Sequence, residues 1–291
     1  MGQFLVEANG QKLGIEIANV YYKKGFTQFK AGKLKKPFSM EALQSSTVLN
    51  TVDRGRLYNV FLNEETGYSG LDVGVTVRGG FEDAGTEVTY EAGVFNGKQS
   101  KAGYSGAQYQ GKDDGFKAKD IAARLQLKGF GGLELDVAFS TKTYDHYLNA
   151  ATSDLVANAA YEAGLAYHLK GFRFQGEIAT GANHKGNDSL IASGSAEFLA
   201  FYGMLLYHQD YSGKRASETL IKLEGLDPDM TIGSGGGKKN DGKFRYTAGI
   251  NYFFTPKISV LTNYGLTQPF TKEIGAGHFV QDIDVLARLN F

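Results

Sequence analysis

Apolar and polar residues alternate along most of the chain with a period of two. Three valines alternate with polar or small residues between positions 71 and 80, and the same pattern recurs over 121–128, 133–140 and 244–252. Successive side chains of a β-strand point to opposite faces, so each segment predicts a strand with one apolar face and one polar face. The chain has no run of about 18 apolar residues, which a transmembrane helix requires. Such strands suit a sheet that separates two different environments.

The connections between these strands alternate between short turns and long, polar, glycine-rich loops. This layout is typical of an outer-membrane barrel, in which a strand of about ten residues crosses the membrane. We therefore predict an all-β fold, an antiparallel transmembrane β-barrel that forms a single domain over residues 1–291. The alternation is least clear over 193–224, where FLAFYGMLLY is apolar on both faces. The predicted strands lie near 3–8, 12–22, 26–35, 70–79, 86–95, 117–128, 131–142, 157–169, 171–181, 193–208, 214–224, 243–254, 257–267 and 279–291.

The composition agrees with a folded, strand-rich chain. Glycine accounts for 39 of the 291 residues and proline for only 4, while 13% of the residues are aromatic. A disordered chain has few aromatic residues and more proline. The aromatic residues collect near the ends of the predicted strands, where a barrel forms two girdles at the level of the lipid headgroups. A soluble β-sandwich, which also places aromatic residues on its strands, is the alternative on pattern alone.

The end of the chain carries a further barrel signal. The segment 283–291, IDVLARLNF, places Ile283, Val285 and the terminal Phe291 on one face. A last strand with this alternation and a C-terminal Phe resembles the signal that the outer-membrane barrel-assembly machinery reads. Phenylalanine would stand at the end of a chain by chance only about one time in 25. We therefore expect Phe291 to contact that machinery.

Charge and cysteine content exclude several classes of function. The 31 basic and 31 acidic residues cancel, whereas a nucleic-acid partner requires a concentrated basic excess. The absence of cysteine excludes disulfide scaffolds, thiolate zinc sites and cysteine nucleophiles. The segment at the N-terminus, MGQFLVEANGQK, has neither the basic region nor the long apolar core of a secretory signal.

Enzyme, metal and cofactor motifs are not supported. The segment 233–239, GSGGGKK, superficially suggests a phosphate-binding loop but lacks the required glycine at Ile232 and the hydroxyl at Lys239. The segment 227–233, DPDMTIG, fails as an EF-hand because its twelfth position is Lys238 instead of a bidentate Glu. The five histidines occur singly, without metal-ligand spacing. We expect no catalytic residues, no metal site and no cofactor, and an outer-membrane lipase would need a Ser/His motif that is not recognisable here.

The first half of the chain resembles the phosphate-selective porin O and P family. The likeness is dense from about residue 14 to 130 and then fades to a compatible strand pattern. Members of that family are similar to one another in being homotrimeric, 16-stranded outer-membrane channels for anions. The segments that carry the resemblance are KAGKLKKPFSMEALQSS (30–46), DRGRLYNVF (53–61), GYSGLDVGVTVRG (67–79), YEAGVFNG (90–97) and KDIAARL (119–125).

The resemblance implies a place for the longest loop. If the last strand is the sixteenth, the strand at 70–79 is the sixth and residues 36–70 form the third external loop, which in porins folds inward and narrows the pore. The sequence would then lack a signal peptide and about two strands, so that an N-terminally truncated barrel is expected and a complete 14-stranded barrel is the alternative. The implied setting is the outer membrane of a Gram-negative bacterium, with its lipids and two further copies of the full-length chain as partners.

A channel selects ions by fixed charge at its narrowest part, because that charge offsets the hydration which the ion loses there. Between positions 36 and 70 the basic residues number three and the acidic residues four, a sum of −1, so anion preference requires these charges to be separated in space. A strand arginine that pairs with a neighbouring carboxylate would instead stabilise the wall. The candidates for the pore constriction are Lys35, Lys36, Arg54 and Arg56, and those for the pore lining are Arg78, Arg124, Arg173, Arg245 and Arg288, of which Arg54 and Arg124 fall on arginines of the family segments.

We therefore predict a passive diffusion porin for small anions such as phosphate. The alternative is a barrel that binds ligands or surfaces through its long loops. Such loops would be expected to carry aromatic contact patches, whereas 96–116 and 225–242 are mostly Gly, Lys, Asp and Ser.

Overall fold

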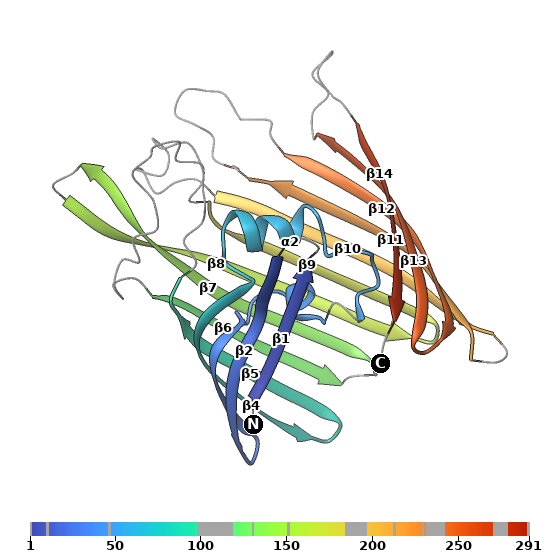
Figure 1. Ribbon diagram of the computed structural model, residues 1–291, viewed down its shortest axis with the longest axis horizontal. Coiled ribbons are helices and arrows are strands. Elements are labelled where there is room, and N and C mark those ends of the chain that lie inside the picture. The colour runs from blue at the N-terminus through green and yellow to red at the C-terminus, as the bar shows by residue number, and fades with distance from the viewer. Residues whose placement is uncertain are drawn as a thin grey trace.

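A single antiparallel sheet of 14 strands, in chain order, makes up the fold (Figure 1). The structure is a computed structural model that describes residues 2–9, 12–45, 48–97, 119–129, 131–149, 152–183, 197–211, 214–228, 230, 242–269 and 279–289. The strands are β1 (Gly2–Asn9), β2 (Lys12–Lys24), β3 (Thr27–Lys35), β4 (Leu71–Asp83), β5 (Thr86–Phe95), β6 (Asp120–Gly129), β7 (Leu133–Asn149), β8 (Thr152–Leu169), β9 (Phe172–Ala182), β10 (Glu197–Asp210), β11 (Ala216–Asp227), β12 (Lys243–Thr255), β13 (Ile258–Pro269) and β14 (Val280–Leu289).

This architecture confirms the predicted all-β antiparallel fold and its strand order. Each strand pairs with the next one along the chain, and the short turns lie where the sequence pattern predicts them. Among the described strands, β1 and β14 are the two edges of the sheet and are not hydrogen-bonded to each other. No helix in the described ranges is both long enough and apolar enough to cross a membrane. The terminal Phe291 and the Lys238 and Lys239 pair lie outside the described residues.

The two faces of the sheet differ in chemistry. One face, here the outer face, exposes apolar side chains such as Val75, which is 55% exposed, and Ile283, which is 71% exposed. The other face, here the inner face, carries polar side chains, among them Asp72, Thr76 and Asp136, which are buried. Polar groups become buried on this face because the long connection from β3 to β4 folds against it (Figure 1).

That connection, residues 36–70, is called the inward loop below. It contains two short helices, α1 (Met40–Leu43) and α2 (Tyr58–Val60), and a π-helical turn, η2 (Phe61–Glu65). Figure 1 shows the loop, coloured blue to cyan, within the curve of the sheet. Its aromatic and aliphatic side chains form the largest apolar cluster in the described part of the chain, together with strand residues. The members that come from the loop are Phe38, Tyr58, Phe61, Leu62 and Tyr68.

The packing of the inward loop against the inner face explains why strand β10 is apolar on both faces. Phe198, Tyr202 and Met204 lie on its inner face and pack in the cluster with the inward loop, whereas Leu205 and Tyr207 lie on the outer face and are about 42% exposed. The ring of Tyr202 meets that of Tyr58 edge to face at 5.1 Å, a geometry that adds to the burial of apolar surface. The blurred alternation near 193–224 thus arises because β10 packs against the inward loop on one face and exposes apolar side chains on the other.

Candidate functional site

The two ends of the inward loop are held together by a buried group of charges. The Lys36 ammonium is 1% exposed and donates to the Asp120 carboxylate and to the Gly67 carbonyl oxygen, at 2.5 and 3.0 Å. Asp72 lies 3.5 Å from the same ammonium, and Lys142 donates to Asp120 at 3.2 Å. Two lysines and two carboxylates balance here, and such mutual pairing is what makes burial of charge tolerable. Lys36 therefore joins the start of the loop to its end.

Lys35 and Arg54 meet at the C-terminal end of α1. The Lys35 ammonium donates to the carbonyl oxygens of Ala42 and Gln44, at 2.7 and 3.0 Å. The Arg54 guanidinium donates to the Gln44 oxygen at 2.6 Å and to that of Glu41 at 3.3 Å. The last carbonyl groups of a helix have no partner within it, and cationic side chains satisfy them well. Both residues are half-buried.

Arg56 lies in a different environment, against the inner face of β14. Its guanidinium is 2.7 Å from Asp284, 3.0 Å from Asp282 and 3.5 Å from Asp53. Arg245 on β12 makes a two-bond contact with the same Asp282, at 2.7 and 2.8 Å. The positive charge of Arg56 is therefore surrounded by carboxylates, and the contact ties the inward loop to the last described strand.

Two carboxylates of the sheet bind the starts of the two loop helices. Glu177 on β9 accepts hydrogen bonds from the backbone N–H groups of Met40 and Glu41, at 2.9 and 2.7 Å. Glu224 on β11 accepts from the N–H groups of Leu57 and Tyr58, both at 3.2 Å. The first N–H groups of a helix lack internal partners, so a carboxylate placed there is favourable. The sheet thereby fixes where α1 and α2 begin.

A polar network surrounds these contacts. Glu41 forms an ion pair with the buried Lys222 of β11 and accepts a hydrogen bond from the Gly55 N–H at 3.0 Å. A side chain at Gly55 would meet the ends of the Glu224 and Lys222 side chains, which would then have to shift, so the loop approaches the wall closely at this glycine. The loop is consequently docked by side chains as well as by backbone.

Tyr58 completes the contact with Glu177. Its hydroxyl donates to the Glu177 carboxylate at 3.2 Å, and Tyr202 donates to the same carboxylate at 2.5 Å. Burial raises the pKa of the Tyr58 phenol well above its ordinary value, and the neighbouring Glu177 and Glu162 carboxylates raise it further. The phenol therefore stays protonated and remains a donor.

The five predicted pore-lining arginines all lie on the inner face but differ in their partners. Arg124 pairs with Asp136 at 2.7 Å, and Arg245 pairs with Asp282. Arg173 donates to the amide oxygens of Asn50 and Gln175, at 3.4 and 2.8 Å. Arg288 donates to the backbone oxygen of Leu49 at 3.2 Å. Arg78 is exposed, in register with Gln28 on β3 and Glu91 on β5.

The carboxylates that hold the inward loop were not among the sequence candidates, whereas the cations Lys36 and Arg56 were. Alternation places Glu177, Glu224 and Asp284 on the polar face of their strands, and that was the only signal available for them. What they bind depends on where the loop lies across the sheet, which periodicity does not encode. Most of the cations of this site were therefore predicted from the sequence, and none of the carboxylates that orient the loop were.

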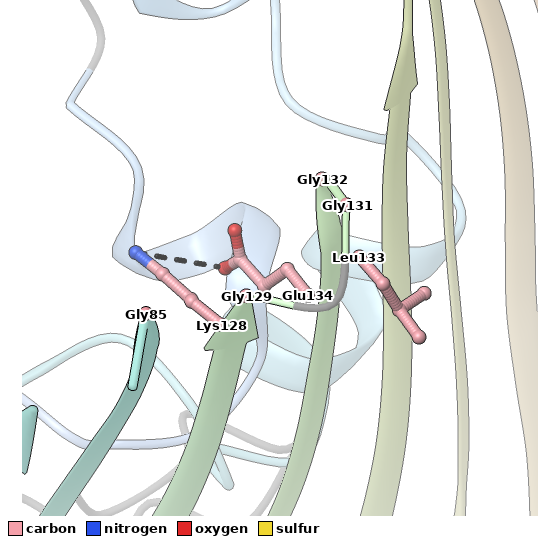
Figure 2. A pocket seen from close by; sticks show the side chains of 7 residues that line it. All are labelled: Gly85, Lys128, Gly129, Gly131, Gly132, Leu133 and Glu134. Carbon is pink, nitrogen blue, oxygen red and sulfur yellow. Dashed lines mark ion pairs between the residues drawn. The ribbon is translucent and has the colours of Figure 1, made fainter. Parts of the chain in front are cut away.

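A shallow hollow, separate from the inward loop, lies at the short-turn end of the sheet (Figure 2). In Figure 2 the side chains of Lys128 and Glu134 approach each other across it, with 3.9 Å between the ammonium and the carboxylate. Four of its seven lining residues are glycines, and its two charged side chains are those of Lys128 and Glu134. Within the described ranges, no group of three His, Asp or Glu side chains is placed to hold a metal ion. The lining residues are Gly85, Lys128, Gly129, Gly131, Gly132, Leu133 and Glu134.

Comparison with known proteins gives a structural likeness without a sequence match. No protein-family model matches the chain, and no curated protein matches it in sequence. The outer membrane channel DcaP of Acinetobacter baumannii is similar with a TM-score of 0.63 and 12% identity, over 100% of this chain and 80% of that one. OmpT, an outer membrane protein of Vibrio cholerae, in its trimer form gives 0.51 and 12%, over 96% and 81%.

An anion-selective porin from Comamonas acidovorans gives a TM-score of 0.55 at 9% identity, over 97% of this chain and 78% of that one. At such low identities the likeness concerns the fold alone. The chain thus has the antiparallel β-barrel type of fold that is found in outer-membrane channel proteins.

Proposed function

We propose that this protein is a passive diffusion channel for small anions, such as phosphate, in the outer membrane of a Gram-negative bacterium. The observation that carries the proposal is the position of the inward loop. It packs on the polar inner face of a sheet whose outer face is apolar and exposed. A solute that moves along the inner face would pass the loop, as a channel with a narrow region requires. The resemblance to phosphate-selective porins and the likeness to an anion-selective porin support the same reading.

The outer face supports contact with lipid. Exposed side chains on neighbouring strands, such as Val75 on β4, Val94 on β5 and Ile121 on β6, form a continuous apolar surface. An apolar belt of this kind faces the hydrocarbon in outer-membrane barrels. Exposed aromatic rings near the short turns, among them Tyr22 and Phe172, suit the headgroup level.

The charges near the inward loop support the choice of anions. We assign the pore constriction to the loop and its root, and the pore lining to the strand arginines of the inner face. Arg56 and Arg245 are balanced by carboxylates, whereas Arg54 and Arg173 contact neutral oxygens, so the positive field would come mainly from the second pair. The constriction group is Lys35, Lys36, Arg54 and Arg56, and the lining group is Arg78, Arg124, Arg173, Arg245 and Arg288.

The proposal extends to assembly. The trimer form of OmpT has a similar fold, and the family that the sequence resembles is trimeric, so we propose a homotrimer for the full-length protein. We also propose that Phe291 is read by the barrel-assembly machinery. The phosphate-selective porin O and P family is the affiliation that these features favour.

Conduction in a planar lipid bilayer tests the function. The full-length protein would be folded in detergent, added to one side of the bilayer and studied in a KCl gradient. We expect channel openings and a reversal potential of the sign that chloride preference gives. Absence of channels from a preparation with a β-sheet circular dichroism spectrum would contradict the proposal, and a cation-selective reversal potential would contradict its anion preference.

A further inference from the structure

We propose that the outer face of the sheet carries a binding site for the headgroup of an anionic phospholipid, centred on Lys214 and Arg215 at the short turn between β10 and β11. The site lies on the side of the wall that faces away from the inward loop. The inference therefore goes beyond the proposed channel and shares with it only the membrane setting. The class of ligand is a phospholipid whose headgroup has a net negative charge, such as phosphatidylglycerol.

The outer face changes from apolar to polar just before this turn. Tyr207 is 42% exposed and is the last ring of the apolar surface on β10. One step closer to the turn, Gln209 on β10 and Ser217 on β11 lie opposite each other in the register. The Tyr211 hydroxyl lies 3.0 Å from the Ser217 hydroxyl and donates to the Gln209 amide oxygen at 3.4 Å. Polar side chains and a tyrosine at the edge of an apolar belt mark the level of the lipid headgroups.

Arg215 belongs to this outer face. The Tyr211 backbone N–H donates to the Arg215 backbone oxygen at 2.8 Å, so strand pairing continues one residue beyond Ala216. Ala216 is buried on the inner face, and successive side chains of a strand alternate, which places Arg215 on the same face as Ser217. Lys214 precedes it in the turn, and both side chains are exposed. Two adjacent cations therefore stand next to the polar edge of the outer face.

The neighbouring short turns add positive charge on both sides. Lys170 lies in the β8–β9 turn and Lys257 in the β12–β13 turn, and both are exposed. With strands about 4.8 Å apart, each lies about two strands, or roughly 10 Å, from Arg215 along the rim. Within the described ranges, none of these four cations forms an ion pair or a side-chain hydrogen bond. Asp210, the carboxylate beside the central turn, belongs to the inner face and lies 3.1 Å from the His208 ring.

The short turns nearer the N-terminus have a mixed charge. Two lysines stand at positions 23 and 24 of the β2–β3 turn, but the next turn, β4–β5, has the exposed carboxylates Glu82 and Asp83. At the β6–β7 turn, the Lys128 ammonium is 3.9 Å from the Glu134 carboxylate. Positive charge is thus concentrated on the arc of the rim between β8 and β13, which favours a local site over uniform attraction.

The outer face next to the cations is suited to acyl chains. The rings of Phe172 and Tyr207 are 4.7 Å apart on β9 and β10, and those of Tyr252 and Phe254 are 4.9 Å apart on β12. Between these two pairs β11 presents the short side chain of Thr219, which is in register with Tyr207. Aromatic rings favour the membrane interface, where they contact the upper part of the lipid chains. A phospholipid on this surface has its phosphate at the level of the two cations.

The charges decide which phospholipid binds. The planar donors of a guanidinium group match the oxygens of a phosphate, and clusters of Lys and Arg attract lipids of net negative charge. A zwitterionic headgroup such as that of phosphatidylethanolamine carries its own ammonium group, which is repelled by Lys214 and Arg215. The short turns of outer-membrane barrels face the periplasm, so the ligand is a phospholipid of the inner leaflet.

Lipid binding by the detergent-folded protein tests the site. The full-length protein would be titrated in non-ionic detergent with phosphatidylglycerol or with phosphatidylethanolamine of the same acyl chains. Native mass spectrometry would count the bound lipids. We expect phosphatidylglycerol to bind several-fold more tightly, because its headgroup has a net negative charge. Equal binding of the two lipids would overturn the site.

Two double variants with the same change in net charge locate the site. K214Q/R215Q should weaken phosphatidylglycerol binding by about tenfold or more, since each Lys or Arg near an anionic surface contributes roughly fivefold. K23Q/K24Q removes two exposed cations from the β2–β3 turn, beside an acidic turn of the same rim, and should bind the lipid as the wild type does. Equal weakening by the two variants would show general attraction to charge and overturn the site.

A second variant covers a failure to fold. If K214Q/R215Q does not give a β-sheet circular dichroism spectrum, K170Q/K257Q is used, and it should weaken phosphatidylglycerol binding by about twofold to fivefold. Wild-type affinity in that variant would count against the proposal.

Inorganic phosphate separates a lipid site from a site for soluble anions. Added in excess at constant ionic strength, it should leave phosphatidylglycerol bound, because it has no acyl chains to rest on the aromatic rings. Displacement of the lipid would overturn the lipid assignment.

Conduction separates this inference from the proposed function. A preference for phosphatidylglycerol that K214Q/R215Q removes, in a protein that forms no channels, would support the site and contradict the channel. Channels from a protein without this preference would overturn the site and leave the channel.

Discussion

The hydroxyl of Tyr58, in the inward loop, donates a hydrogen bond to the carboxylate of Glu177 on β9 at a distance of 3.2 Å. Since Glu177 also binds the backbone at the start of α1, one wall residue holds both helices of the loop. The loop is thereby attached to the sheet at defined points and is not merely packed against it by apolar contact.

Tyr58→Phe should destabilise the protein by about 1–3 kcal/mol, because a buried hydrogen bond to a charged group is lost. The ring and its contact with Tyr202 would remain. The free energy of unfolding, measured by urea titration in detergent, checks this. Tyr22→Phe is the control, since Tyr22 lies on the outer face and is 64% exposed. Equal stability of the two variants would show that the bond to Glu177 contributes nothing.

Glu177→Gln should loosen the loop. Each carboxylate oxygen accepts from two donors, one backbone N–H and one phenol, so replacing either oxygen with NH2 leaves one backbone N–H without an acceptor and forces one phenol hydroxyl to turn away. We expect a loss of about 1–3 kcal/mol for each unsatisfied group, together with noisier single-channel current. Bilayer recording checks the noise, and Glu82→Gln, at an exposed position, is the control. Wild-type noise in Glu177→Gln would mean that this carboxylate does not hold the loop during conduction.

Leu125→Arg should destabilise insertion by about 2–4 kcal/mol if the outer face lies in lipid near the membrane midplane. Leu125 is 41% exposed on that face. Refolding into lipid vesicles, followed by urea titration, measures the difference, with Leu125→Met as an apolar control. A neutral result for the arginine would indicate that this part of the outer face does not contact hydrocarbon.

Sequence pattern was sufficient for the strands and their order but not for the docking of the loop. Alternation predicted Arg245 on a polar face, and the register of β11 with β12 places Glu224 opposite it. It could not predict that Arg56, 189 residues before Arg245, shares Asp282 with it (245 − 56 = 189). Such contacts depend on how a long loop crosses the sheet, and a local period carries no information about that path. Only β10 indicated where the loop lies, because its residues are apolar on both faces.

The last prediction concerns ion selectivity. Replacing Arg54 and Arg56 with Glu should move the reversal potential in a KCl gradient from anion preference toward cation preference. Two unit charges at 4 Å interact by about 4 kcal/mol at an effective dielectric of 20, compared with about 1 kcal/mol in bulk water. A permeating anion near the loop should therefore respond strongly to a reversed charge. The R56Q/D284N variant is the matched control, because it removes one positive and one negative charge from a single ion pair and leaves the net charge unchanged.

This control should keep the wild-type reversal potential. Lys257→Glu, at an exposed position in the short turn between β12 and β13, should also have little effect, because charges beyond about 8 Å are screened at physiological salt. If R54E/R56E leaves the reversal potential unchanged, the inward loop does not set selectivity, and the positive charges that matter must lie among the strand arginines. A shift of equal size in Lys257→Glu would instead point to a general surface effect, because that residue is remote from the loop contacts described for Arg54 and Arg56.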